Sequence, residues 1–528
     1  MAARMQRGLL PRAVRPEART WDLEPCEETP ATEFFLPWAR DPNTKARQAL
    51  GVSHVTATHI DRLTEDLTNV VRRSLLFLRY VTRAEVRKNG QLLAGCDLDR
   101  GDGTDLLVSF RPGDDVEQWH ILRADASARA AALYAAHPRL EGLRRSTRIS
   151  IGVRVDPEPL EEGLLYAFLP TEHSTGLPLH INADFFPESD RKAIVFKGHQ
   201  HEHAWNEMLI DAAAIELARD PVALHATLGD AQFWRVLSNA YELQSRPSGH
   251  PGIFKQFWDR LKPACANVPI VLVQQDDSLR RPNETILPHG APFTPRQVMV
   301  LQELGGHVAI DSLQTHRNTM IQLGAQILTF DRLLNLIQGG LSALKAGESQ
   351  VTPERVETFY RPLWMMLGDL LPEQGSQGPA MARAVQRLRA LPAIVSEDLY
   401  CVTINQSYAA PSFLDSTRVA QLLPGLSIAS RGLGAAPKVL SLVATLDLAG
   451  VVAHLSKLAQ DNSLADGGIS FEPKGPKDLY DLFADLDVGK QTNESVYKEL
   501  RALPVWPSSR GLISAQAALL PGNFSSLW

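Results

Sequence analysis

The chain has 528 residues, of which 44% are hydrophobic and 22% are charged, and its formal net charge is -6. This composition is typical of a folded globular protein, and the length predicts about two to four domains rather than a single core. The negative charge argues against a dominant nucleic-acid-binding surface. The four cysteines form no CxxC pair, which argues against a disulfide framework and a thiolate zinc site.

Two stretches of the sequence have features of targeting or membrane signals. Residues 1–31 begin with MAARMQRGLLPRAVRPEART, which is rich in arginine and nearly free of acidic residues, as organelle transit peptides are. It holds no serine, so we interpret it as the flexible leader of a cytoplasmic protein, with organelle targeting as the alternative. Residues 439–455 are strongly apolar, but this stretch is short and contains Asp447 and His454. It therefore predicts a buried core helix and no membrane partner.

Residues 32–215 are predicted to form the first folded region, an α/β domain. TEFFLPWARD (32–41) is typical of a strand that ends in a proline and charged residues. Residues 57–73 place apolar side chains at helical spacing, which predicts a helix with one buried face. These side chains belong to Ile60, Leu63, Leu67 and Val70.

The middle of this region reads as a sheet. Asn89-Gly90 lies between two apolar runs and predicts a tight hairpin. DRGDG (99–103) imitates a nucleotide-binding glycine motif, but the strand-like TDLLVSF follows it, so a second hairpin turn is the better interpretation. Further strands are expected at 148–156 and 164–170.

Beyond this region the apolar residues recur at the spacing of a helix, every three to four residues. Residues 216–470 are predicted to be mostly helical, with no internal repeat of fixed period, and residues 471–528 to be a small, truncated C-terminal α/β module. Helices are expected at 222–243, 252–262, 295–304, 317–345, 353–371, 380–391 and 438–460. The predicted fold class is therefore α+β: a sheet region, a mainly helical region and a small appended module.

FKGHQHEHAW (196–205) holds three histidines at alternate positions, His199, His201 and His203. They could ligate a metal if they converged with a further ligand from elsewhere, because imidazole nitrogen binds zinc well. HExxH is not present, and the residues that follow are helical, where only the first and third histidines are neighbours. A solvated entrance to a helix is therefore the favoured interpretation.

YAFLPTEHSTGLPLHINADFFPESDRKAIVF (166–196) is the most informative stretch. A strand ends near Pro170, LPLHIN extends again, and the cationic pair Arg191-Lys192 follows. We interpret it as a rigid loop that presents Asn182 and two cations from the rim of a sheet. Such groups suit a phosphate, because a guanidinium forms two parallel hydrogen bonds to its oxygens. The alternative is a surface loop with solvated charges.

This stretch resembles the sacsin family, whose units carry a FLPL…TGLPxHIN…F…RR pattern after a heat-shock-type ATPase module. FLP, TGLPLHIN, FF and DRKAI stand here in the same order and at similar spacing, with Lys192 in place of the second arginine. SLLFLRYVTRAEV and the late LRALPVWPSSRGLISAQAALLPGNF are also similar to phrases of that family. The resemblance covers residues 32–215 and 500–524.

The resemblance implies a region that lies after an ATP-binding domain and resembles the middle domain of the ninety-kilodalton heat-shock chaperones. In those chaperones an arginine on a loop of the form LPLNxSRE reaches the γ-phosphate of ATP. By this resemblance Arg191 would sense the γ-phosphate, with Lys192 beside it and Asn182 shaping the loop. ATP and magnesium would bind in a separate N-terminal domain, and the partners would be protein clients or partner domains.

The chain departs from the family in one respect. Residues 1–31 cannot build an ATP pocket, and in residues 57–73 an arginine, Arg72, stands where the second acid of the nucleotide box is required. Either the chain is a fragment, or it descends from an ATPase that lost its nucleotide domain. We expect no cofactor and no ATP hydrolysis in the chain alone.

The resulting expectation is a chaperone-like or scaffold module that couples an ATP-binding domain to a helical client or partner surface. Two alternatives remain. One is a metal-dependent hydrolase that uses His199, His201 and His203. The other is a pure protein-interaction scaffold with no link to a nucleotide.

Overall fold

The computed structural model confirms an α+β chain, which divides into two compact units, Met1–Ala213 and Ala214–Trp528. No helix among the described residues is long and apolar enough to cross a membrane. The structure describes residues 45–51, 55–101, 103–198, 201–245, 252–342, 344, 350–372, 378–423, 425–460, 477–487, 493–508 and 511–517. The strand predicted at 32–41 and the leader lie outside these ranges.

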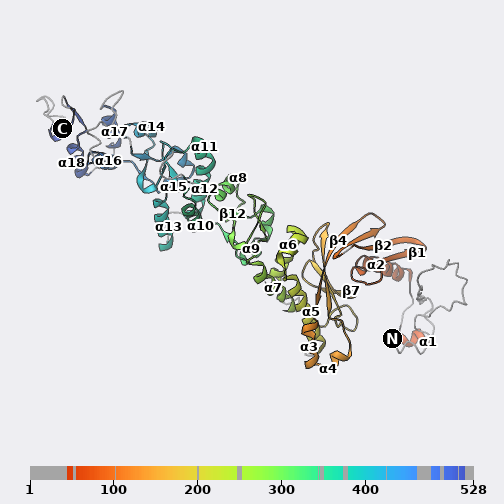
Figure 1. Cartoon of the computed structure of the whole chain (residues 1–528). Coiled ribbons are helices and arrows are strands. Elements are labelled where there is room, and N and C mark those ends of the chain that lie inside the picture. Colours follow the sequence, from red (N-terminus) through yellow and green to blue (C-terminus); the bar gives the residue numbers. More distant parts are fainter. Residues whose placement is uncertain are drawn as a thin grey trace. The chain divides into compact units, whose positions relative to one another are not determined.

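The first unit is built on an eight-stranded sheet with the strand order β1-β2-β3-β4-β5-β8-β6-β7 (Figure 1). Neighbouring strands are antiparallel except β6 and β8, which are parallel. The strands are β1 (Arg83–Lys88), β2 (Gln91–Arg100), β3 (Asp105–Arg111), β4 (Val116–Asp125), β5 (Arg148–Asp156), β6 (Leu164–Ala167), β7 (Leu169–Ser174) and β8 (Leu179–Ala183).

Both predicted hairpins are confirmed. Asn89 and Gly90 have φ values of 51° and 79°, so the two-residue turn between β1 and β2 uses the left-handed region at both positions. An asparagine followed by a glycine reaches these angles more easily than other residues do. The DRGDG stretch joins β2 to β3, where Arg100 pairs with Leu106 across an antiparallel ladder.

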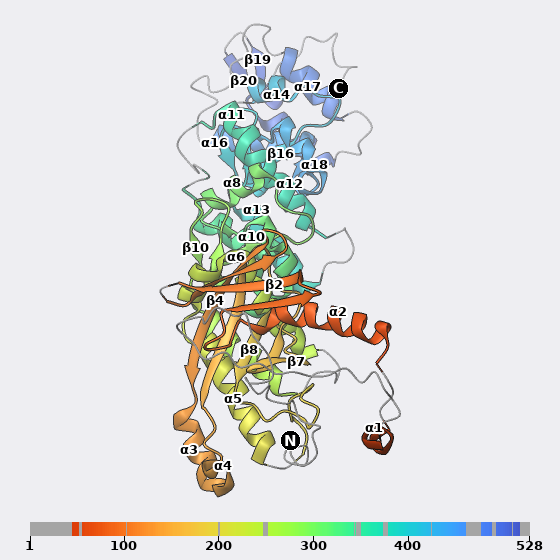
Figure 2. The same cartoon turned by 90° about the vertical axis from the view of Figure 1, so that its right-hand side faces the viewer.

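Helix α2 (Ala57–Ser74) confirms the predicted helix, but its apolar stripe is not buried. Leu63, Leu67 and Val70 are 42%, 45% and 47% exposed, so the expectation of a buried face is wrong. The end of the helix is buried instead, at Ser74 and the following leucines. The rest of α2 (Figure 2) lies beside β1 and β2, where Asp61 forms an ion pair with Lys88 at 2.6 Å, but its apolar stripe stays exposed. Helical spacing shows that a face is apolar, but not that another element covers it.

Short helices complete the first unit. They are α1 (Lys45–Leu50), α3 (Ser127–Ala136), α4 (Pro138–Gly142) and the start of α5 (His201–Leu217), and α3 and α4 lie beyond the end of β4 in Figure 1. Side chains in the first two turns of α5 anchor this helix to the segment that follows β8. The Trp205 indole is fully buried and donates to the Asp184 carbonyl oxygen at 3.0 Å. Asn206 accepts from the Phe186 amide at 2.8 Å and donates to the carbonyl oxygens of Phe186 and Val195.

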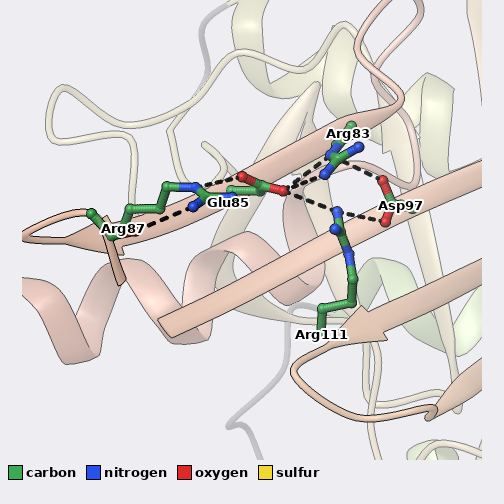
Figure 3. A network of polar contacts seen from close by, with 6 residues as sticks. Arg83, Glu85, Arg87, Asp97 and Arg111 are labelled. Carbon is green, nitrogen blue, oxygen red and sulfur yellow. Dashed lines mark hydrogen bonds and ion pairs between the residues drawn. The ribbon is translucent and has the colours of Figure 1, made fainter. Parts of the chain in front are cut away.

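A closed polar network crosses the first three strands (Figure 3). The Glu85 carboxylate accepts hydrogen bonds from Arg83, Arg87 and Arg111 at 2.6–3.0 Å. Asp97 completes the network through ion pairs to Arg83 at 3.5 Å and Arg111 at 2.8 Å. Because β1 is an edge strand, these charges also oppose pairing with a second sheet.

We predict that this network gives the first unit an acid-dependent contribution to stability. Hydrogen bonds from Arg83 and then Arg87 lower the pKa of Glu85 from 4.5 to about 2. A lowered pKa means a contribution that is present above about pH 4.5 and is lost as the pH falls through about 2. In urea titrations, Glu85→Gln should have a lower midpoint than wild type at pH 6, and this difference should vanish toward pH 2.

The change in the urea midpoint should be small, because exposed ion pairs contribute little to the free energy of unfolding. Glu65→Gln is the matched control, since Glu65 is exposed on α2 and forms no ion pair among the described residues. A midpoint difference for Glu85→Gln that does not change with pH would contradict the prediction.

The second unit contains a supersecondary unit that occurs twice. Each copy is a two-stranded hairpin, a three-stranded parallel sheet and the helices between its strands, coloured green for the first copy and cyan to blue for the second in Figure 1. The first copy comprises β9 (Val271–Leu272), β10 (Leu279–Arg280), η4 (Pro282–Glu284), β11 (Thr285–Leu287), α8 (Pro295–Glu303), β12 (His307–Val308), η5 (Asp311–His316), α9 (Arg317–Gln322), β13 (Gln326–Ile327) and α10 (Phe330–Gly339).

The second copy has the same elements in the same order. They are β14 (Ile394–Val395), β15 (Cys401–Val402), η7 (Ile404–Gln406), β16 (Ser407–Ala409), α14 (Ser416–Leu422), β17 (Ser427–Ile428), η8 (Arg431–Ala435), α15 (Pro437–Leu440), β18 (Ala444–Thr445) and α16 (Leu448–Gln460).

Helices outside the copies are α6 (Pro221–Ser245), η3 (Gly252–Lys255), α7 (Gln256–Cys265), α11 (Pro353–Arg355), η6 (Val356–Tyr360), α12 (Arg361–Leu370), α13 (Pro379–Ala390), α17 (Lys477–Asp487) and α18 (Glu494–Ala502).

The two copies agree in register and not only in element order. The central strand β11 pairs Ile286 with Val308 and with Gln326, and the central strand β16 pairs Tyr408 with Ile428 and with Ala444. A bridge joins each hairpin to the second strand, Val273 to Ala309 and Ser396 to Ala429. The hairpin turns also match, because Asp277 and Leu399 both have positive φ, 51° and 63°.

These copies form a repeat without a fixed period, and they correct two expectations from the sequence. The helices predicted at 317–345 and 438–460 are each interrupted by the third strand of a copy, β13 or β18, so residues 439–455 are not one buried helix. Short apolar runs do not distinguish a buried strand from a helix, which explains the error. A third hairpin, β19 (Trp506–Ser508) with β20 (Gly511–Ile513), is followed by η9 (Ala515–Ala517) as in the copies.

One apolar core joins the two copies. It includes Ile286 and Val308 of the first copy, Ile394 of the second, and Trp364 of α12 between them. A separate core packs α16, α17 and α18 together. The two copies therefore share buried surface rather than folding as separate domains.

Candidate anion-binding site

Asn182 lies inside the sheet and not on a loop. It belongs to β8, it is 9% exposed, and its side-chain oxygen accepts the Phe168 amide hydrogen at 2.9 Å. Phe168 connects β6 to β7 and has a positive φ of 68°. The buried Asn182 amide therefore holds the β6–β7 connection in a conformation that a phenylalanine rarely adopts.

Arg191 and Lys192 lie on an exposed turn after β8. The Arg191 amide donates to the Glu188 carbonyl oxygen at 2.9 Å, and its φ is 62°. The Lys192 ammonium forms an ion pair with Glu172 at 2.8 Å, and this hydrogen bond raises the pKa of Lys192. No hydrogen bond or ion pair joins Asn182 to either cation among the described residues. The γ-phosphate role of Arg191 stays a prediction.

The histidines at the start of α5 have partners of their own. His201 lies 3.4 Å from Glu202, and His203 lies 3.1 Å from Glu207. Within the described ranges, no group of three or more His, Cys, Asp or Glu side chains could hold a metal ion. His199 lies outside those ranges, so the hydrolase alternative stays an untested prediction.

A groove of about 930 Å³ opens where β4, β5 and β8 meet the segment that follows α2. Asn182 lies in its wall together with four arginines from four separate segments. These arginines are Arg79 after α2, Arg100 at the end of β2, Arg123 on β4 and Arg148 at the start of β5. We call this feature the arginine groove.

The sheet register brings several polar groups onto one face of the groove. Arg123 pairs with Ser150, and Ser150 pairs in turn with Asn182, so the three side chains lie in a row across β4, β5 and β8. Asp125 pairs with Arg148, which makes Arg123 and Arg148 diagonal neighbours, about 7–8 Å apart on the same face of the sheet. The alternation of side chains along strands therefore aims both guanidinium groups at the same space.

The two acidic residues that line the groove form hydrogen bonds and ion pairs with groups other than the groove arginines. Asp184 forms an ion pair with Arg145 at 2.6 Å and accepts the Ser146 amide hydrogen. Asp125 accepts from the Thr147 hydroxyl at 2.7 Å and from the Ser127 amide at 2.9 Å, and these bonds lower its pKa. Neither carboxylate forms a salt bridge with a groove arginine among the described residues, although the charge of Arg148, opposite Asp125 in the ladder, also helps to lower the pKa of Asp125.

The arginine groove thus differs from the network in Figure 3, where each guanidinium has a carboxylate partner. None of the four groove arginines forms a salt bridge within the described part of the chain. Arg100 donates to the Leu78 carbonyl oxygen, which anchors it to the segment after α2 and leaves further N–H groups free to bind a ligand. Like charges held together repel one another, so an anion in the groove would be stabilised.

A second hollow, about 270 Å³ in volume, lies on the neighbouring part of the sheet and is lined by Trp119, Tyr166 and His180. His180 accepts the Leu164 amide hydrogen at 2.8 Å and stacks on Trp119. Burial, together with Arg73 and Arg154, lowers the pKa of His180 to about 3. The imidazole ring of His180 is therefore neutral at physiological pH. We interpret the side chains around this hollow as structural residues that hold β8 against its neighbours.

Asn182 was predicted from its sequence pattern to be a site residue, whereas the four arginines were not. They lie in four separate segments of the chain and share no local motif. The only local signal is the alternation of Arg148 and Ser150 with apolar residues in RISIGVRVD. Comparison of the chain with protein-family models, with curated proteins and with solved structures finds no match.

Proposed function

We propose that this chain is a scaffold or chaperone-like module of a sacsin-like protein, and that it recognises a phosphate-bearing partner through the arginine groove. The observation that carries this proposal is the set of four arginines around one groove, none of which forms a salt bridge with a carboxylate among the described residues. Guanidinium groups bind phosphate oxygens through pairs of hydrogen bonds, which makes arginine the residue best suited to such a ligand.

This proposal keeps the phosphate ligand expected from the sequence but places its main binding site in the arginine groove instead of at Arg191. Arg191 lies on an exposed turn and does not line the groove, whereas Asn182 does. The second unit supports the scaffold part of the proposal, because repeated supersecondary units build extended surfaces on which protein partners bind. ATP hydrolysis by this chain alone is not part of the proposal.

We predict that inorganic tripolyphosphate binds the full chain and that the groove arginines carry the affinity. In calorimetric titrations at low salt, Arg123→Gln combined with Arg148→Gln should weaken binding at least about tenfold, since each substitution removes charge-assisted hydrogen bonds. Arg281→Gln combined with Arg361→Gln removes the same charge from exposed positions outside the groove and should leave the affinity unchanged.

Arg191→Gln, titrated in the same way, tests the role expected from the sequence. If this variant loses the affinity and the groove pair keeps it, the phosphate site belongs to the turn after β8. If neither the wild type nor any variant binds tripolyphosphate, the proposed function fails.

A further inference from the structure

The rim of the arginine groove carries two exposed aromatic rings. Tyr80 is 86% exposed and Phe168 is 51% exposed, and both line the groove. Large aromatic side chains bury much apolar surface when they are covered, so leaving two of them uncovered beside one groove costs stability. Their position beside a group of arginines is therefore a feature that the fold itself does not require.

The backbone holds Phe168 in this position. Its positive φ of 68° is an unfavourable conformation for a residue with a side chain, of the kind that is found at binding sites. The hydrogen bond from the Phe168 amide to the buried Asn182 oxygen secures the conformation. Asn182, which lies in the groove wall, therefore also fixes the position of the Phe168 ring.

The second ring is already in contact with a cation. The Arg79 guanidinium lies 5.9 Å from the centre of the Tyr80 ring. An arginine beside an aromatic ring offers a stacking surface and a positive charge together. Arg123 and Arg148 are diagonal neighbours across β4 and β5, and Arg79 and Arg100 come from two further segments, so the groove offers guanidinium groups to more than one phosphate.

We propose that the arginine groove binds single-stranded nucleic acid, with phosphates on the arginines and bases stacked on Tyr80 and Phe168. This inference rests on the proposed function, because it names the ligand class of the same groove. A positively charged groove with exposed aromatic rings is the arrangement that binds single strands without strict sequence preference. A duplex fits less well, since its stacked bases cannot reach the rings. The net charge of -6 does not oppose a local site of this kind.

The test uses the full chain and a fluorescein-labelled single-stranded 12-mer of uridine or thymidine, measured by fluorescence anisotropy. Binding should weaken steeply as salt increases, because phosphate contacts release counterions. Tyr80→Ala combined with Phe168→Ala should weaken 12-mer binding at least about tenfold. The same variant should lose much less affinity for tripolyphosphate than for the 12-mer, because tripolyphosphate has no bases to stack on the rings. Tyr80→Trp combined with Phe168→Trp should restore the binding of the 12-mer.

Two comparison ligands separate this inference from the proposed function. An abasic 12-mer has the same phosphates without bases, and a doubly phosphorylated peptide has phosphates on a different backbone. If the wild type binds tripolyphosphate but binds the 12-mer no more tightly than the abasic strand, or prefers the peptide, the nucleic-acid inference is wrong and the proposed function stands. If it binds none of these ligands, both are wrong.

Discussion

Gly163→Ala is expected to destabilise the first unit by more than about 3 kcal/mol, the largest effect of any single substitution that we predict there. Gly163 is buried directly before β6, and its backbone bonds to Leu177 and Thr175 fix its position. A Cβ atom at this position would overlap the carbonyl group of Leu179, which is backbone and cannot rotate away. Overpacking that forces backbone to move costs about 1–3 kcal/mol or more, and here the displaced strand is β8 in the middle of the sheet.

Urea unfolding, followed by hydrogen exchange in the strands of the first unit, measures this loss, and the binding of tripolyphosphate should fall with it because Asn182 lies on β8. Gly142→Ala is the matched control. No atom lies within 4 Å of a Cβ built on Gly142, so its unfolding midpoint should stay close to that of the wild type. An unchanged midpoint for Gly163→Ala would show that the approach of Leu179 to residue 163 is not as close as described.

Trp364→Ala should have the largest effect in the second unit, at least about 4 kcal/mol. The Trp364 side chain is fully buried in the core that joins the two copies, and replacing a buried tryptophan with alanine leaves a large cavity. Its indole donates to the Ala393 carbonyl oxygen at 2.9 Å, so the variant also leaves that buried oxygen without its donor. Because the core includes residues of both copies, we expect both copies to lose stability together.

Hydrogen exchange measured along the chain tests this coupling. Protection should fall in β11 and in β16, although neither strand contains Trp364. Met365→Ala serves as the control, since Met365 is the next residue along the helix and is 46% exposed, so its removal creates no buried cavity. Loss of protection confined to the second copy would mean that the copies unfold independently.

The local elements of the first unit could be predicted because each has a local cause. Asn89-Gly90 favours one turn type, and the alternation in RISIGVRVD fixes a strand with one buried face. The exposure of Leu63, Leu67 and Val70 could not be predicted, because burial depends on which element lies opposite. The sequence pattern of α2 is the same whether or not a partner covers it.

The candidate site was predictable only in part. TGLPLHIN drew attention to Asn182, and the structure places this residue in the groove wall. The arginines that accompany it come together only when β2, β4 and β5 adopt their order in the sheet, and that order is a property of the whole fold. Arg191, which is close to Asn182 in sequence, lies outside the groove. Proximity along the chain was therefore a poor guide to proximity in space.

The copies of the second unit differ in the lengths of their connecting helices. Their strands keep the same pairing, whereas α14 has 7 residues against 9 in α8, and α15 has 4 against 6 in α9. The parallel ladder thus accommodates connecting helices of different lengths without a change of register. A protein engineer could use these connections to graft a foreign helical epitope or a reporter onto the molecule. The hairpins should be left untouched in such a construction, because they preserve the bridges from Val273 and Ser396 to the parallel sheets.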